Sequence, residues 1–269
     1  MKAQAMILAA GRGERMRPLT DATPKPLLMV RGKPLMQWPL EALARGGFRD
    51  VVVNTAWLGE RISGQFGGHF VLKPSSTVHN KLLNKEQFSI ASSIIYSHEG
   101  RDFGGALETA GGIARALPLL GDVFWVLAGD VFAPDFVFSQ TAVERFKQSG
   151  QLAHIWLVPN PEHNPKGDFG LSADGLALNL AVGADQPKYT YSTIGLYHRA
   201  LFARPWCDIP AGNPKGVKAA LAPLLRMAMD QSLVSAELFQ SQWTDVGTPE
   251  RLKSLNQDEN ERTSHEARP

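Results

Sequence analysis

Short apolar runs are the clearest pattern along the chain, and they predict strands. The first run, residues 3–10, is almost entirely apolar and ends at Gly11, which is typical of a central strand covered on both faces of a parallel sheet. The predicted strands are 3–10, 50–54, 93–97, 123–128, 152–158, one within 187–197, and one or two short ones within 234–243.

Segments with more polar residues lie between these runs and predict helices. The predicted helices are 34–46, 57–65, 108–117, 139–149, 215–231 and one that starts at 248. Pro223 lies inside the fifth, where a kink or break is expected because proline removes a backbone hydrogen bond. The segment 11–33 is rich in glycine and proline and predicts a loop, and the polar stretch 66–92 predicts a long excursion.

Strands that alternate with helices through the first half of the chain predict an α/β fold. We expect a mixed, mostly parallel central sheet flanked by helices. The order of the elements predicts a single domain over residues 1–255. From Asn256 onward the chain has one apolar residue, Ala267, so residues 256–269 are predicted to form a polar, disordered tail.

The composition is that of an ordinary globular protein, with 43% apolar and 20% charged residues among 269. A net charge of only +2 argues against a nucleic-acid-binding protein. No apolar run approaches the ~20 residues that span a membrane, and the apolar N-terminal stretch is too short for a signal peptide. The single cysteine, Cys207, cannot form an intramolecular disulfide, which predicts a cytoplasmic protein. The sequence gives no indication of the oligomeric state.

The positive charge is concentrated at the N-terminus, where residues 1–33 carry a net charge of +5. This segment follows the first predicted strand, and ligands of open α/β sheets bind at the carboxyl ends of the strands. Gly11 and Gly13 would let backbone N–H groups approach an anion. Four basic side chains beside them could bind a polyphosphate, namely Arg12, Arg15, Arg17 and Lys25.

Two familiar phosphate-binding motifs do not match this loop. The GxxxxGK[ST] pattern is absent, and the GxGxxG pattern fails because Met16 stands where it requires glycine. A glycine turn beside solvated basic side chains is the simplest alternative. Four basic residues at one junction between strand and loop count against it.

The segment LAAGRGERMRPLTDATPKPLLMVRGKPL, at residues 8–35, resembles the N-terminal signature of sugar-1-phosphate nucleotidylyltransferases. The resemblance continues through LETAGGI, LAGD and WTDVGTPERL and covers most of the chain. Within this family the chain is most similar to N-acetylmuramate-1-phosphate uridylyltransferases, which act in peptidoglycan recycling. The resemblance implies a Rossmann-like nucleotide-diphospho-sugar transferase fold. It also implies transfer of a uridylyl group from UTP to N-acetylmuramic acid 1-phosphate, giving UDP-N-acetylmuramic acid and pyrophosphate.

Two aspartates are the candidate metal ligands. Asp130 follows the strand VFWVLAG, and Asp245 precedes the last predicted helix. The sequence alone favours a turn or cap residue at each position. The resemblance implies that both hold Mg²⁺, a hard cation that suits carboxylates and substrate phosphates. It also implies a catalytic role for Asp130, Arg15 at the pyrophosphate portion, and Lys25 at the α-phosphate or the sugar phosphate.

The remaining candidate residues follow from the resemblance. For the nucleotide they are Leu8, Ala10, Gly11, Arg12, Gly13, Lys25, Glu99, Glu108 and Thr109, with Glu99 expected to accept the uracil N3–H. Glu108 could instead complement the dipole of a helix. For the sugar they are Ala128, Asp168, Gly170 and Thr193. Ala128 stands where close relatives often carry asparagine, so the exact sugar stays open.

Three alternatives remain beside this interpretation. Another sugar-1-phosphate nucleotidylyltransferase would use glucose or mannose 1-phosphate with UTP, dTTP or GTP. A non-catalytic nucleotide-sugar sensor would be expected to have lost at least one of Arg15, Lys25, Asp130 and Asp245, and all four are present. A kinase would need a phosphate loop or a catalytic-loop motif, and neither is found. The seven histidines show no metal-ligand spacing.

Overall fold

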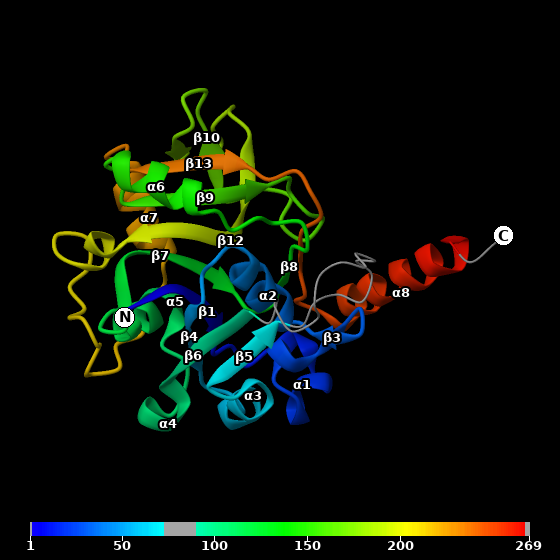
Figure 1. Cartoon of the computed structure of the whole chain (residues 1–269). Coiled ribbons are helices and arrows are strands. Elements are labelled where there is room, and N and C mark those ends of the chain that lie inside the picture. Colours follow the sequence, from blue (N-terminus) through cyan, green and yellow to red (C-terminus); the bar gives the residue numbers. More distant parts are fainter. Residues whose placement is uncertain (1, 73–89, 267–269) are drawn as a thin grey trace, which may run out of the picture.

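The computed structural model describes residues 2–72 and 90–266, and its core is a ten-stranded mixed sheet (Figure 1). The central strand β1 (Ala3–Ala9) pairs in parallel with β4 (Asp50–Thr55) on one side and β7 (Leu120–Ala128) on the other. Beyond β4 lie β6 (Ile90–His98), also parallel, and the antiparallel edge strand β5 (His69–Leu72). The predicted mostly parallel sheet is confirmed for this half.

Antiparallel strands extend the sheet on the far side of β7. The long strand β12 (Lys188–His198) pairs with β7, β9 (Ala153–Val158) and β10 (Phe169–Leu171). Strand β13 (Val234–Leu238) pairs in parallel with β9, and β11 (Ala177–Leu178) pairs antiparallel with β10. Two small ladders lie outside the main sheet, β2 (Met29–Val30) with β3 (Lys33–Pro34) and β8 (Val131–Phe132) with β14 (Thr244–Asp245).

Helices cover both faces of the sheet because side chains alternate across each strand. Along β7, Phe124 and Val126 pack in one apolar core, and Trp125 and Leu127 pack in the other. The first core receives α5 (Glu108–Ala116) and α7 (Ala222–Met229). The second receives α2 (Gln37–Arg45), α3 (Gly59–Phe66) and α6 (Gln140–Gln148). The result is a three-layer α/β structure.

Three short helical turns lie in the segment 11–33, which was predicted to be a loop, and two more lie in segments for which no element was predicted. The remaining helical segments are η1 (Glu14–Met16), α1 (Leu19–Ala22), η2 (Lys25–Leu27), α4 (Glu99–Phe103) and η3 (Arg199–Phe202). Strand β5 lies within the stretch that was predicted to be a loop. The rest of that stretch, residues 73–89, lies outside the described residues.

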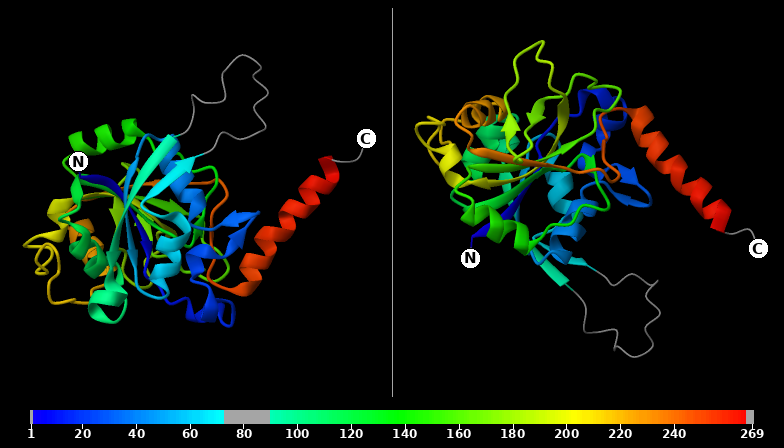
Figure 2. Two further views of the ribbon diagram at one scale, coloured as in Figure 1. Left: turned by 60° about the horizontal axis from the view of Figure 1, so that its bottom comes forward. Right: turned by 90° about the horizontal axis from the view of Figure 1, so that it is seen from above.

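Two predicted helices differ from the structure. The segment predicted as a helix over 215–231 is helical only in α7, and Pro223 lies in its first turn. Proline fits this position because the first helical N–H groups have no partner within the helix, so Pro223 starts the helix instead of breaking it. Helix α8 (Pro249–Glu266) continues through most of the segment predicted to be disordered, and it projects from the rest of the molecule (Figure 2).

Candidate active site

A cavity of about 550 Å³ opens at the carboxyl ends of the central strands. Strand ends supply its floor, and the starts of α5 and α7 supply two of its walls. Nine of the residues predicted for the site line it, namely Leu8, Ala10, Gly11, Lys25, Glu108, Thr109, Ala128, Asp130 and Thr193. The edge of the sheet that the sequence indicated is therefore the edge that carries the cavity.

The loop after β1 is held by its own hydrogen bonds. Gly13 has φ of 69°, a left-handed conformation that favours glycine, and its carbonyl accepts from the Thr20 hydroxyl at 2.8 Å. The Arg12 guanidinium lies 3.6 Å from the centre of the Trp57 ring and donates to the Thr20 carbonyl at 3.0 Å. Trp57 donates to the same carbonyl at 2.9 Å.

Arg12, Gly13 and Arg15 do not line the cavity. The Arg12 guanidinium, which was predicted to bind phosphate, contacts Trp57, Thr20 and Asp21 instead of the cavity. Arg15 is exposed beside the loop. Neither guanidinium is therefore part of the cavity wall.

Lys25 and Asp130 form the charged centre of the cavity. Lys25 is only 9% exposed, and its ammonium donates to Asp130 Oδ2. Asp130 lies two residues beyond the end of β7. Between them, the Gly129 N–H donates to the Leu8 carbonyl at 2.8 Å and ties the end of β7 to β1. The pair places one positive and one negative charge within a largely apolar cavity, where electrostatic interactions are stronger than in water.

The β8–β14 ladder brings the two predicted metal ligands together. Asp245 is in register with Val131, and the Val246 N–H donates to the Asp130 carbonyl at 2.9 Å. The Asp245 carboxylate contacts the guanidinium of Arg251 and lies 3.0 Å from His163 Nε2. Two aspartates that are about 115 residues apart in the sequence are thus neighbours in the fold.

The donor set fits one divalent ion that is completed by substrate. Within residues 2–72 and 90–266, no three side chains of His, Cys, Asp or Glu converge as a metal site. Two carboxylates plus phosphate oxygens are a usual ligand set for a hard cation such as Mg²⁺. Asp130 lines the cavity and Asp245 does not, and the two stay the predicted ligands of such an ion.

Asn54 was not predicted, and it organises the nucleotide side of the cavity. Its amide oxygen accepts from the Ala9 N–H at 2.9 Å, and its amide nitrogen donates to Glu99 Oε1 at 2.7 Å. Glu99 Oε2 accepts from the Leu107 N–H at 2.8 Å. The one sequence signal for Asn54 is its place as a polar residue at the end of the apolar run DVVVN.

Glu99, which was predicted to accept from the uracil N3–H, is fully buried and does not line the cavity. Both of its carboxylate oxygens are used to join β4 to the segment before α5. Burial raises the pKa of Glu99, while the hydrogen bonds from Leu107 and Asn54 and the charge of Arg115 oppose the rise. Glu99 supports the residues that line the cavity.

We expect Glu99→Gln to change how stability depends on pH. Because its pKa is raised in the folded state, native Glu99 favours folding less as pH rises from about 4.5 through the raised value. Glutamine does not titrate, so the stability difference between the wild type and Glu99→Gln should shrink from pH 5 to pH 8 in urea titrations. Glu144→Gln, at an exposed site paired with Lys147, is the control. An unchanged difference across this range would contradict the assignment.

The start of α5 faces the cavity through Glu108 and Thr109. Glu108 has φ of 59°, an uncommon conformation for a residue other than glycine. The first N–H groups of a helix lack partners within the helix and can donate to a ligand. The two residues were predicted for nucleotide binding, and the structure places both on the cavity wall.

On the other side of the cavity, Thr193 is the most distinctive residue. It has φ of 64°, which is strained for a β-branched side chain, and it lies where the pairing of β12 with β9 shifts register. Its buried Oγ1 has no hydrogen-bond partner among the described residues. Strain and an unsatisfied hydroxyl at a cavity wall are typical of functional sites.

Asp168 and Gly170, both predicted for the sugar, do not line the cavity. Asp168 accepts from the Tyr191 N–H at 2.8 Å and therefore fixes the backbone beside β12. A side chain on Gly170 would meet Leu180 at 2.5 Å, so this position is needed for packing. Four apolar residues of this wall were missed because their pattern is that of ordinary core: Phe169, Tyr191, Leu221 and Leu225.

Comparison with known proteins decides the family. The family model described as "Nucleotidyl transferase" matches residues 4–262. The chain belongs to this family. The nucleotidyl transferase is 44% identical over 253 residues to the N-acetylmuramate alpha-1-phosphate uridylyltransferase of Neisseria meningitidis serogroup B, covering 93% of this chain and 95% of the relative.

More distant relatives agree with this assignment. The chain is 34% identical to the UTP–glucose-1-phosphate uridylyltransferase of Synechocystis, covering 91% of this chain and 60% of that protein. A crystal structure of a Bacillus anthracis protein described as a glucose-1-phosphate thymidylyltransferase superposes with a TM-score of 0.67 at 20% identity, over 95% of this chain and 94% of that one. This likeness confirms the fold. No helix within the described residues is long and apolar enough to cross a membrane.

Proposed function

We propose that this nucleotidyl transferase moves a uridylyl group from UTP to N-acetylmuramic acid 1-phosphate, giving UDP-N-acetylmuramic acid and pyrophosphate. The observation that carries the proposal is the 44% identity with the meningococcal uridylyltransferase over nearly the full length of both chains. The cavity supports it, because the Lys25–Asp130 pair lies between the start of α5 and Thr193. A cytoplasmic location and a role in peptidoglycan recycling follow from the same proposal.

The reaction asks little covalent chemistry of the protein. A phosphate oxygen of the sugar phosphate attacks the α-phosphorus of UTP in line, a new P–O bond forms, and pyrophosphate leaves with the electrons of the broken bond. The attacking phosphate is already ionised, so no general base is needed. Catalysis then depends on positioning two polyanions and on stabilising negative charge.

Each part of the cavity has a place in this scheme. Backbone groups of Leu8–Gly11 and the start of α5 would bind the nucleoside, and Lys25 would bind the α-phosphate or the sugar phosphate. Arg15, exposed on the loop after β1, would bind the pyrophosphate portion. Mg²⁺, held by Asp130 and Asp245, would supply charge neutralisation at the phosphates. Thr193 and Ala128 lie on the wall assigned to the sugar.

The proposal is tested by measuring pyrophosphate release with each pairing of three nucleotides and three sugars. UTP, dTTP and GTP are combined with the 1-phosphates of N-acetylmuramic acid, glucose and mannose. Release that is fastest by at least ~100-fold with UTP and the muramic sugar is expected, since a well-fitted site discriminates by about 3 kcal/mol. Faster release with another pair would identify another sugar-1-phosphate nucleotidylyltransferase. If a nucleotide binds but none of the pairs releases pyrophosphate, the protein is a sensor.

A further inference from the structure

The Asp245 carboxylate is held from one side. The Arg251 guanidinium donates to Oδ1, and its Nη1 also donates to the Asp245 carbonyl at 3.0 Å. His163 Nε2 lies 3.0 Å from the same Oδ1. Among the described residues, no donor is found on Asp245 Oδ2. Two different segments of the chain thus converge on one oxygen and leave the other available.

The chain around Arg251 is shaped to admit the guanidinium. Arg251 lies in the first turn of α8, and its N–H donates to Thr248 Oγ1 at 3.4 Å. A side chain at position 247 would come within 2.7 Å of the guanidinium and 3.0 Å of Asp245 Oδ2, so Gly247 leaves the space that both groups occupy. Arg251 is 20% exposed and Asp245 24%, so the contact is largely shielded from water.

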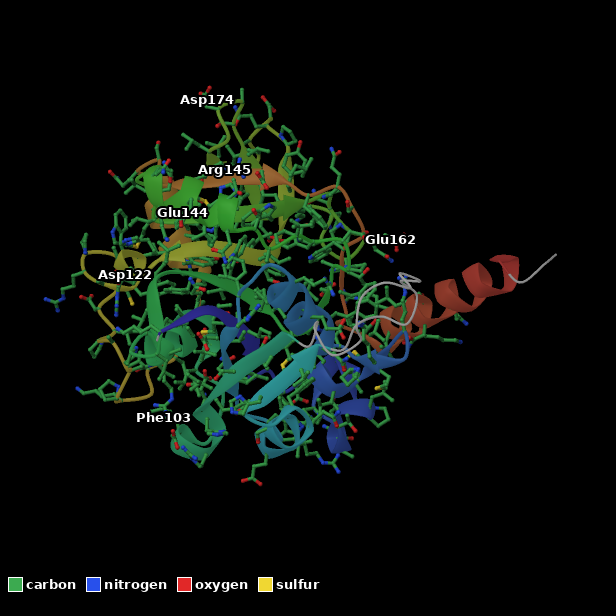
Figure 3. All side chains as sticks on the ribbon, viewed as in Figure 1. Phe103, Asp122, Glu144, Arg145, Glu162 and Asp174 are labelled. Atoms are coloured by element: carbon green, nitrogen blue, oxygen red, sulfur yellow. The ribbon has the colours of Figure 1, made fainter. Side chains whose placement is uncertain are left out.

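His163 reaches Asp245 from a loop that is tied to β12. Asn160 donates to the Lys188 carbonyl at 2.8 Å and accepts from the Thr190 hydroxyl at 3.0 Å. Asn164, next to His163, donates to the same hydroxyl at 3.1 Å. The neighbouring Glu162 lies at the periphery of the molecule (Figure 3). These bonds fix the loop that presents the imidazole.

We infer that Arg251 and His163 are positioning residues that orient Asp245 toward the metal ion, an inference that rests on the proposed function. Partners that fix a ligating carboxylate typically change metal affinity by 10- to 100-fold when they are removed. Asp130 is arranged alike, because Lys25 donates to its Oδ2 and no donor among the described residues lies on its Oδ1. Each carboxylate therefore has one oxygen engaged by a cation and one oxygen without a donor among the described residues.

The charges around the two aspartates predict that the divalent ion binds tightly only together with the nucleotide. Lys25 and Arg251 balance the two carboxylates, so a divalent ion alone meets a pair of aspartates that is already neutralised. A triphosphate adds negative charge at the same place. Affinity for the ion should thus be measured with the nucleotide present.

The test is a titration of the whole protein with Mn²⁺ in the presence of α,β-methylene UTP, followed by the electron paramagnetic resonance signal of free Mn²⁺. Arg251→Lys keeps the charge but loses the planar guanidinium that bridges two acceptors, so long-range electrostatics cancel in the comparison. We expect its dissociation constant for Mn²⁺ to rise at least tenfold, and that of His163→Phe by a similar factor. Arg204→Lys, in an exposed pair with Asp208, is the matched control.

A kinetic measurement separates positioning from general damage. The Mn²⁺ concentration that gives half the maximal rate should rise in Arg251→Lys, while kcat at saturating Mn²⁺ and the KM for UTP stay within about threefold of the wild type. Melting curves check that the variants fold. If Arg251→Lys does not fold, the Mn²⁺ affinity of His163→Phe tests the inference.

The possible outcomes separate this inference from the proposed function. Asp245→Asn should weaken Mn²⁺ binding. If it does, and both positioning variants bind Mn²⁺ as the wild type does, the inference is wrong and the metal site stands. If Asp245→Asn binds Mn²⁺ unchanged, the metal assignment in the proposed function fails and the inference fails with it.

Discussion

Asp130→Asn is expected to lower kcat by ~10³-fold or more, which corresponds to about 4 kcal/mol of lost transition-state stabilisation. Asp130 is the one carboxylate among the described residues that both lines the cavity with Lys25 and is proposed to hold the ion. Asparagine has nearly the same shape but no charge, so the cavity keeps its form and loses half of the proposed metal ligands. Binding of UTP should fall less than turnover, because backbone groups make much of the nucleotide site.

The measurement is steady-state pyrophosphate release together with UTP binding by calorimetry. Asp122→Asn is the control, because this aspartate is 79% exposed and lies at the edge of the molecule (Figure 3). Turnover of Asp130→Asn within tenfold of the wild type, with an unchanged dependence on Mg²⁺, would show that the metal is bound elsewhere.

Trp125→Ala should reduce the free energy of unfolding by about 3–5 kcal/mol. The Trp125 ring is fully buried on the sheet face opposite Val126 and contacts four aromatic rings, those of Phe48, Phe136, Phe138 and Trp156. Alanine leaves a large cavity at the centre of this cluster, and the surrounding rings cannot all move to fill it. Urea denaturation monitored by circular dichroism measures the loss.

Trp125→Phe separates packing from hydrogen bonding. The indole N–H is buried without an acceptor among the described residues, so the smaller ring gives up no hydrogen bond. The expected loss is about 1–2 kcal/mol, well below that of alanine. A loss of under 1 kcal/mol for Trp125→Ala would mean that the cluster repacks, and it would contradict the rigid core described for this face.

The strands were predictable because burial on both faces leaves a plain mark in the sequence. The runs at 50–54 and 123–128 became β4 and the second part of β7, with boundaries that differ by a few residues at most. The helices were harder. Pro223 starts α7, and the extended segment before it packs against the start of α5, where the Ala110 N–H donates to the Ala219 carbonyl at 2.8 Å. The helix propensity of residues 215–231 could not predict this hydrogen bond, because it depends on a distant part of the chain.

The centre of the site was predictable, and its surroundings were not. Lys25 and Asp130 belong to motifs of the family, and the structure joins them. Asn54 and Arg251 act on groups far away in the sequence, so no local pattern distinguishes them from an ordinary strand end and an ordinary helix start. Glu99 is a different case, because the fold fully buries a carboxylate that the sequence assigned to the base.

The small β8–β14 ladder has a consequence for how the enzyme becomes active. A single two-residue pairing joins a side chain from the middle of the chain to one that leaves the ribosome about 115 residues later. A nascent chain could form the β1–β4–β7 sheet and much of the cavity while still lacking one of the two proposed metal ligands. Turnover would then begin only when the last strand docks, so the appearance of activity during synthesis or refolding would report completion of the fold, later than signals from the central sheet.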